Sequence, residues 1–286
     1  MTEFRIVARE GRDGLGEGPL WSPSRGGLFW VDIVAPALRF LHLASGRIDS
    51  WTMPERIGWV VERRGTDGLI AGLKSGFHDL DLDPFLLRLI GDPEPDRPEN
   101  RLNDAKVDAA GRIWAGSKDD RDLAASGALY RLDSDRSWSR NDDGYGVTNG
   151  PTFSLDGTIL YHTDSPTRTV YAFDLAPDGS LSGKRPFIRF DEDWGYPDGM
   201  TTDAEGGLWI AHWDGGRISR FWPDGSLDRS VALPAANITS IAFAGAALDR
   251  MFVTSASLDD DRHEHAGALF EVFAGATGLL AGQYAG

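Results

Sequence analysis

Residues 205–210 read Glu205-Gly-Gly-Leu-Trp-Ile210, a glycine-containing turn followed at once by a short apolar run. A turn and an apolar run recur at 25–30, 66–71, 110–115, 156–161 and 248–253. The first apolar residues of the six runs are Leu28, Leu69, Ile113, Ile159, Leu208 and Met251, so successive copies lie 41, 44, 46, 49 and 43 residues apart. A repeat of roughly 40–50 residues built from hairpins is typical of β-propeller blades, each of which is one four-stranded sheet. The sequence therefore predicts an all-β, six-bladed β-propeller that forms a single domain over residues 1–286.

The segment before each motif is predicted to be the innermost strand of its blade. These segments are 15–19, 57–61, 101–105, 147–151, 196–200 and 238–242. Four of them carry a polar residue in an otherwise apolar stretch, namely Glu17, Asn103, Asn149 and Asp198. Packing alone does not explain such groups, because a buried carboxylate without a partner is costly. Since innermost strands surround the propeller axis, we expect these side chains to converge there and to form a polar site that binds a metal.

The two ends of the chain predict how the ring closes. Alternating strands are expected after the motifs at 37–43, 76–80, 128–132, 170–175, 218–221 and 268–273. The chain that follows residue 273 is too short for a convincing fourth strand of the last blade. Phe4-Arg-Ile-Val-Ala8 is a spare β-type segment at the other end. We therefore predict that this N-terminal strand pairs with the last blade and removes an open sheet edge.

Composition excludes several kinds of partner. With 44 Asp and Glu against 29 Lys and Arg, the net charge is −15, so the surface repels phosphate backbones and nucleic acid is not an expected partner. Cysteine is absent, which rules out disulfides and thiolate metal sites and fits a cytoplasmic location. Residues 1–7 lack the apolar core of a signal peptide, and no apolar stretch approaches the ~20 residues that span a bilayer. We expect a cytoplasmic protein with a small-molecule ligand, no membrane association and no obligate protein partner.

The predicted metal ligands are Glu17, Asn149 and Asp198. Each also has an ordinary explanation, because Gly-Glu-Gly, Asn-Gly-Pro and Pro-Asp-Gly all occur in surface turns. The two other Pro-Asp-Gly copies, at 177–179 and 223–225, fall where outer turns are expected, whereas Asp198 falls on a predicted inner strand. Two carboxylates and an amide oxygen form a hard ligand set that favours Ca²⁺, Mg²⁺ or Mn²⁺. Zn²⁺ and Fe²⁺ would be tolerated, but neither is the first choice without His or Cys ligands.

Arg101 and Asn103 are the predicted substrate-binding residues. They stand two apart on one strand, so both side chains should face the same way. A guanidinium and an amide at the channel mouth suit a polyhydroxy ligand or a developing oxyanion. The alternative is that Arg101 pairs with an acidic neighbour such as Asp104. His162 and His212 are interpreted as structural or rim residues, and no Gly-x-Ser-x-Gly motif supports a serine hydrolase.

Several motifs occur in an order and spacing more specific than those of a propeller in general. They are Gly16-Glu-Gly-Pro19 with Trp30-Val-Asp32, Arg101-Leu-Asn-Asp104, Thr148-Asn-Gly150, and Pro197-Asp-Gly-Met200 with Asp203-Ala-Glu-Gly-Gly-Leu-Trp209. From about Leu15 to the C-terminus, the chain resembles the gluconolactonase/regucalcin (senescence marker protein) family. This resemblance implies a six-bladed propeller that binds one divalent metal through Glu17, Asn149 and Asp198. It also implies that Arg101 and Asn103 contact a sugar lactone, and that the reaction is hydrolysis of an aldonolactone to the aldonic acid.

The chain departs from the family pattern at Ser117-Lys-Asp-Asp-Arg121. An acidic substrate-facing residue of the family would fall near Asp120 or Arg121, and an arginine would invert its charge, so Lys118 and Arg121 bear on sugar selectivity.

The hypothesis is metal-assisted ester hydrolysis with Asp198 as the general base. A glucono-, xylono-, arabinono-, galactono- or rhamnono-lactone remains open as the substrate. The rival interpretations are a non-enzymatic calcium-binding protein and a propeller hydrolase of organophosphates or other esters.

Overall fold

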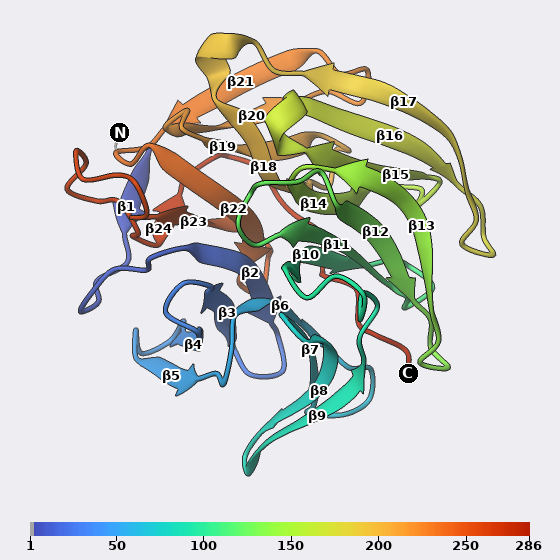
Figure 1. The fold of residues 1–286 in the computed structure, drawn as a ribbon. Helices are drawn as coiled ribbons and strands as arrows, with labels where there is room; N and C mark the ends of the chain where they lie inside the picture. The colour runs from blue at the N-terminus through green and yellow to red at the C-terminus, as the bar shows by residue number, and fades with distance from the viewer. Residues whose placement is uncertain (1–2) are drawn as a thin grey trace.

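The computed structural model describes residues 3–286 as six four-stranded antiparallel sheets arranged in a ring (Figure 1). The first blade contains β2 (Gly16–Ser22), β3 (Gly27–Asp32), β4 (Ala37–His42) and β5 (Ile48–Thr52), and the second contains β6 (Ile57–Glu62), β7 (Leu69–Leu73), β8 (Gly76–Leu82) and β9 (Phe85–Gly91). The third contains β10 (Asn100–Val107), β11 (Ile113–Asp119), β12 (Gly127–Leu132) and β13 (Trp138–Tyr145), and the fourth contains β14 (Thr148–Phe153), β15 (Ile159–Asp164), β16 (Thr169–Leu175) and β17 (Leu181–Arg189). The fifth contains β18 (Tyr196–Thr202), β19 (Leu208–Trp213), β20 (Arg217–Phe221) and β21 (Leu227–Ala232), and the sixth contains β22 (Asn237–Ala244), β23 (Arg250–Ala256), β24 (Phe270–Val272) and β1 (Phe4–Ile6). Two short 3₁₀ helices, η1 (Ser165–Thr167) and η2 (Glu192–Trp194), lie in loops of the fourth and fifth blades.

The prediction of an all-β, six-bladed propeller is confirmed. The innermost strands are β2, β6, β10, β14, β18 and β22, which coincide with the six segments selected from the sequence. Each of them contacts the innermost strands of the two neighbouring blades, so the six surround the axis (Figure 1). A residue on the axial side of any of these strands therefore faces the central channel.

All six inner strands interrupt their pairing with the second strand at a comparable level. The interruptions fall between Glu17 and Leu20, Ile57 and Trp59, Leu102 and Ala105, Asn149 and Thr152, Pro197 and Met200, and Ile238 and Ser240. Such bulges redirect side chains and are frequent beside active sites. The bulges also explain why proline occurs inside two inner strands. Pro19 and Pro151 lie where the pairing is interrupted, so the missing N–H removes no hydrogen bond between the strands.

The apolar core lies between blades and is tied to polar groups by buried tryptophans. Trp30, Trp114 and Trp209 come from the apolar runs of three motifs, and all are fully buried. Their Nε1–H groups donate to the carboxylates of Asp13, Asp108 and Asp203, each at 2.9 Å. Each indole thus satisfies its polar end while its ring packs in the core.

Closure of the ring by the N-terminal strand is confirmed. β1 pairs antiparallel with β24, with Phe4 opposite Val272 and Ile6 opposite Phe270. Arg5 Nε donates to Glu271 at 2.7 Å, and the Phe4 ring meets the Phe270 ring edge-on at 5.8 Å. β24 is shorter than the predicted strand at 268–273.

The last residues of the chain have a role that the sequence analysis did not predict. The Tyr284 backbone N–H donates to the Glu62 carbonyl at 2.8 Å, and its own carbonyl accepts from the Arg64 backbone N–H at 2.8 Å. The Tyr284 hydroxyl donates to the Asp133 carbonyl at 2.6 Å. Tyr284 is fully buried. The C-terminal segment therefore joins the second and third blades and passes over one end of the channel.

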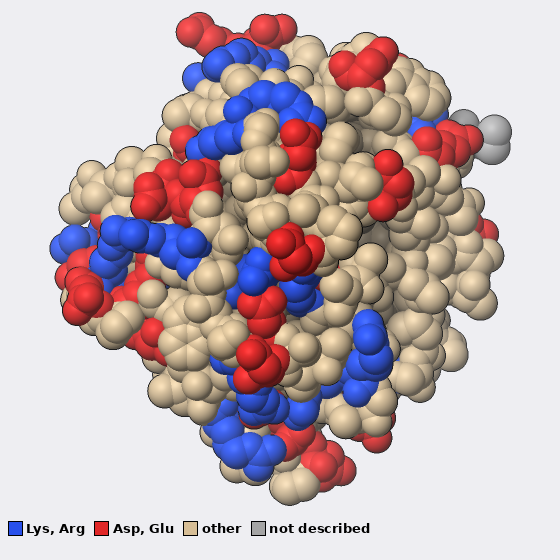
Figure 2. All heavy atoms as spheres, turned by 90° about the vertical axis from the view of Figure 1, so that its right-hand side faces the viewer, with Lys and Arg blue, Asp and Glu red and all other residues tan. Residues whose placement is uncertain are grey.

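The surface carries interspersed charges. On the face shown in Figure 2, basic side chains lie beside acidic ones. Ion pairs with at least one exposed side chain include Lys184 with Asp142 and Arg88 with Asp81. Within residues 3–286, none of the helices is long and apolar enough to cross a membrane.

Deletion of residues 1–8 should lower the thermal midpoint by roughly 5–10 °C, because it removes β1 and leaves the β24 edge unpaired. Differential scanning calorimetry measures this. Glu10→Ala, at an exposed position just beyond the deletion, is the control and should leave the midpoint unchanged. An unaltered midpoint in the deletion variant would contradict the role of β1 in closing the ring.

Candidate functional site

The five residues selected from the sequence all lie on inner strands and are all buried. Glu17 is on β2, Arg101 and Asn103 are on β10, Asn149 is on β14, and Asp198 is on β18. Their exposed fractions range from 4% to 7%. The structure therefore gathers polar groups from four blades around one end of the channel.

The carboxylates of this site are close enough to perturb one another. Burial raises the pKa of Glu17 well above its ordinary value, and the negative charges of Asp198 and Asp104 raise it further. The pKa of Asp198 is raised in the same way, by burial first and then by Asp104. We call Glu17, Asp104 and Asp198 the axial cluster. Because like charges in a buried site repel, this cluster needs a proton or a cation to neutralise part of its charge.

Hydrogen bonds orient Asn149 toward the cluster. Asn103 Nδ2 donates to Asn149 Oδ1 at 2.8 Å and to the Thr148 carbonyl at 2.6 Å. Asn149 Nδ2 in turn donates to Ser165 Oγ at 2.9 Å. The amide of Asn149 is thus held at both ends, and both N–H groups of Asn103 are used inside the protein.

Asp198 has the least satisfied side chain of the site. Its Oδ1 atom is buried and has no hydrogen-bond partner among residues 3–286. An unpaired carboxylate oxygen in this position costs free energy unless something else binds it. This atom is therefore the clearest point at which a ligand could enter the site.

Asp104 belongs to the site, although the sequence analysis considered it only as a partner of Arg101. It accepts the Gly150 N–H and the Ala105 N–H, both at 2.8 Å, and so ties the bulge of β14 to that of β10. Burial raises its pKa. Its position directly after Asn103 was the available signal, but nothing in the sequence showed that it would bond across 46 residues.

Arg101 pairs with Asp120 instead. Its Nε donates to Asp120 Oδ1 at 2.8 Å and its Nη1 to the Leu102 carbonyl at 3.1 Å, which leaves Nη2 with no partner among the described residues. Arg121 points away, because its nearest carboxylates are those of Glu99 at 3.3 Å and Asp119 at 3.6 Å, and its side chain is 55% exposed. Asp120 is therefore the carboxylate that faces Arg101, and the influence of Arg121 on sugar selectivity stays a prediction.

The donor set suits a hard divalent cation. Within residues 3–286, no three His, Cys, Asp or Glu side chains form a metal-binding group by themselves. The amide oxygen of Asn149 would complete a set with Glu17 and Asp198, leaving room for water and substrate. His162 and His212 are fully buried, as expected for structural residues. Burial lowers their pKa values to about 3 and about 4, so both are neutral at pH 7.

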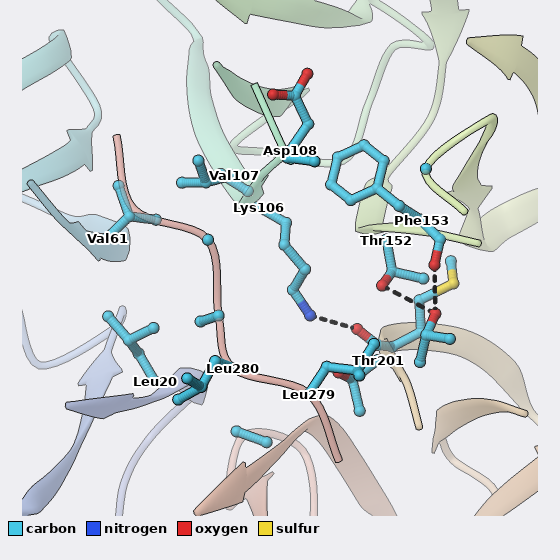
Figure 3. Close-up of a pocket in the computed structure, with 18 of the residues that line it drawn as sticks. Leu20, Val61, Lys106, Val107, Asp108, Thr152, Phe153, Thr201, Leu279 and Leu280 are labelled. Carbon is cyan, nitrogen blue, oxygen red and sulfur yellow. Dashed lines mark hydrogen bonds between the residues drawn. The ribbon is translucent and has the colours of Figure 1, made fainter. Parts of the chain in front are cut away.

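A larger cavity of about 660 Å³ lies further along the inner strands, and apolar side chains such as Leu20, Val61 and Leu279 contribute to its walls (Figure 3). Lys106 extends into this cavity, and its Nζ donates to the Met200 carbonyl at 2.8 Å (Figure 3). The Lys106 ammonium also attracts Asp104 and therefore offsets part of the negative charge of the site from the side of this cavity. Asp104 lines this cavity, whereas the carboxylates selected from the sequence face the other end of the channel.

Comparison with known proteins gives concordant results. Residues 15–257 match the family described as the SMP-30/gluconolactonase/LRE-like region. The chain is 34% identical over 283 residues to L-arabinolactonase of Azospirillum brasilense, covering 96% of this chain and 93% of the relative. It is 33% identical over 242 residues to 6-deoxy-6-sulfogluconolactonase of Pseudomonas putida, covering 84% and 83%. The solved structure of a calcium-binding protein, regucalcin, from Agrobacterium tumefaciens has a TM-score of 0.93 at 28% identity, covering 98% of this chain and 97% of that chain.

Charge repulsion in the cluster generates a prediction about stability. In a chelator, Asp198→Asn and Glu17→Gln should melt at or slightly above the wild-type temperature, because each removes a buried negative charge. Addition of Ca²⁺ at about 100 times its Kd should raise the wild-type midpoint by roughly 5–10 °C and leave both variants nearly unchanged.

The matched control is Asp224→Asn, which changes the exposed aspartate of another Pro-Asp-Gly sequence and should keep the full Ca²⁺ response. An Asp198→Asn variant that melts lower in chelator and still responds to Ca²⁺ would contradict the assignment.

Proposed function

The chain belongs to the SMP-30/gluconolactonase/LRE-like family, and we propose on that premise that it is a metal-dependent sugar lactonase that hydrolyses an aldonolactone to the aldonic acid. The observation that carries this proposal is the Oδ1 atom of Asp198, which is buried and has no hydrogen-bond partner among residues 3–286. The same buried site holds Arg101, whose Nη2 group also has no partner among those residues. Ester hydrolysis needs a group that accepts a proton from water and a group that stabilises negative charge on the carbonyl oxygen. The names of two relatives, an L-arabinolactonase and a 6-deoxy-6-sulfogluconolactonase, support the reaction class.

Glu17, Asn149 and Asp198 would hold one divalent cation, with Ca²⁺ favoured by the all-oxygen ligand set and Mg²⁺, Mn²⁺, Zn²⁺ or Fe²⁺ as alternatives. When bound, this cation would polarise the lactone carbonyl and lower the pKa of a water molecule. The name of the solved regucalcin structure, a calcium-binding protein, supports the choice of a divalent cation.

Asp198 is the proposed general base. Its Oδ1 is free to accept the proton of the attacking water, and the same carboxyl group can return that proton to the ring oxygen that leaves. The bond that forms joins the water oxygen to the carbonyl carbon, and the bond that breaks joins that carbon to the ring oxygen. The product is the open-chain acid.

Arg101 and Asn103 have different roles in this proposal. The Nη2 group of Arg101 can donate to the carbonyl oxygen or to a sugar hydroxyl. Both N–H groups of Asn103 are occupied, so only its carbonyl oxygen can bind the sugar, as an acceptor from a hydroxyl. Asn103 therefore orients Asn149 and accepts one hydroxyl, and Arg101 supplies the donors.

A non-enzymatic calcium-binding protein is the second candidate, since one similar solved structure is described as a calcium-binding protein. Cation binding alone does not need Arg101, whose guanidinium is buried beside the cluster with unused donors.

Proton release on a panel of five- and six-membered aldonolactones tests the function. Protein stripped of metal should be inactive, and turnover above the spontaneous rate should return when one divalent cation is restored. Asp198→Asn should lower kcat at least 100-fold, with metal content measured in parallel to separate loss of the base from loss of the cation. Tight cation binding without turnover of any lactone would favour the binding-protein alternative.

A further inference from the structure

Basic side chains gather beside the candidate site around a single carboxylate. Asp120 accepts from Arg101 at 2.8 Å and from Arg56 at 2.5 Å, and Lys74 Nζ lies 3.5 Å from its other oxygen. Elsewhere among residues 3–286 a carboxylate has at most two such partners, as Asp79 does with Arg63 and Arg136. Three cations around one carboxylate are unexpected in a chain whose net charge is −15.

Lys118 adds a fourth positive charge. It lies directly opposite Arg101 in the pairing of β10 with β11, and both side chains are buried, with exposed fractions of 10% and 4%. Like charges opposite each other on neighbouring strands destabilise a sheet. The ion-pair partner of Lys118 is Asp122, 2.5 Å away, whose side chain is 59% exposed to water.

The charges do not balance within this group. Arg56, Lys74, Arg101 and Lys118 carry four positive charges, and Asp120 and Asp122 carry two negative ones. The axial carboxylates do not account for this excess, because the proposed divalent cation would balance Glu17 and Asp198. The remaining carboxylate, that of Asp104, is attracted by Lys106. A cation directly opposite another cation is a cost that the fold would avoid without a function. Hydroxyl groups of a neutral sugar need hydrogen-bond donors and acceptors, but they do not need two net positive charges.

The basic group also has a direction. Lys118 forms a β-bridge with Val147, two residues before Asn149. Arg101, opposite Lys118, stands two residues before Asn103 on β10, so both cations lie near the axial cluster. Arg56 and Lys74 are 40% and 35% exposed, so they lie further out, toward the solvent. A substrate with its carbonyl group at Asp198 and its carbon chain directed toward Asp120 would therefore pass Arg101 and Lys118 and then reach the more exposed Arg56 and Lys74.

We propose that the lactone taken by this site carries a negatively charged substituent, a carboxylate, a sulfonate or a phosphate ester, on the carbon chain beyond the lactone ring, and that Lys118 binds it together with Arg56 and Lys74. This inference rests on the proposed lactonase function and specifies its substrate class. Charge-assisted hydrogen bonds to such a group are stronger than those to a hydroxyl, and the anion would neutralise the excess of positive charge.

The test compares kcat/KM for a neutral aldonolactone with kcat/KM for the same lactone bearing a terminal carboxylate, sulfonate or phosphate. The wild-type protein should prefer at least one anionic lactone by about tenfold or more, and the preference should shrink as ionic strength rises. The three anionic lactones distinguish the three substituents. No preference for any of them would overturn the inference, even if neutral lactones are opened.

Variants assign the preference to residues. Lys118→Met should lower the ratio of anionic to neutral kcat/KM about tenfold, and Lys118→Arg should restore most of it because the charge is kept. Lys184→Met removes a lysine that is paired with Asp142 and lies on β17, the outermost strand of the fourth blade, and it should leave the ratio unchanged. If Lys118→Met does not fold, Arg56→Gln and Lys74→Gln at the half-exposed rim should each lower the ratio about threefold.

A wild-type preference that survives all of these substitutions would contradict the assignment of the residues. If no lactone of either kind is opened, the proposed function fails and this inference fails with it. Opening of neutral lactones alone would leave the proposed function standing and reject only the anionic substrate.

Discussion

Three buried carboxylates, those of Glu17, Asp104 and Asp198, lie close enough to repel one another, and holding them together is the constraint around which the site is organised. Side chains of like charge separate unless the backbone holds them in place. Here they come from three different blades, so each position is fixed by a complete four-stranded sheet. The packing of the whole propeller therefore opposes the separation of these carboxylates. Lys106 also offsets part of their negative charge by attracting Asp104.

The bulges of the inner strands bring these groups to the axis, and two glycines show why the local sequence is so restricted. Gly150 has a φ of +37°, and a Cβ there would lie 2.7 Å from the Met200 nitrogen. A Cβ on Gly199 would lie 2.7 Å from the carbonyl oxygen of Thr239 on the next inner strand. Any side chain at either position would push neighbouring inner strands apart, and Asn149 and Asp198 adjoin these glycines directly. The glycines of these turn-like motifs are therefore needed because neighbouring inner strands approach each other closely there, and not because the chain turns.

Much of this architecture could be predicted from the sequence because it depends on local patterns. The turn-and-strand motif is local, so the six blades and the inner strands could be derived from periodicity. The closing role of residues 4–8 followed from the missing fourth strand of the last blade. What could not be predicted depends on contacts between distant residues. Asp120 meets Arg56 across 64 residues, and Tyr284 reaches Asp133 across 151. The roles of Asp104, Asp120 and the C-terminal segment became visible only once the ring was formed.

Charge divides the site into two regions with different chemistry. The axial region is acidic, buried and suited to a cation, whereas the neighbouring region around Asp120 holds three basic side chains, two of which are partly exposed to solvent. Arg101 lies between the two regions. It is paired with Asp120, and its positive charge lowers the pKa of Glu17. This differs from Arg220, a fully buried arginine that is paired with Asp203 and stabilises the core of the fifth blade.

The most direct measurement is the anomalous difference density of crystals grown with Mn²⁺. A single strong peak on the axis, about 2.0–2.6 Å from oxygens of Glu17, Asn149 and Asp198, is the result that this account predicts. Absence of a peak at that position, or a peak coordinated by other residues, would contradict the claim that the buried carboxylates are held together to bind a cation.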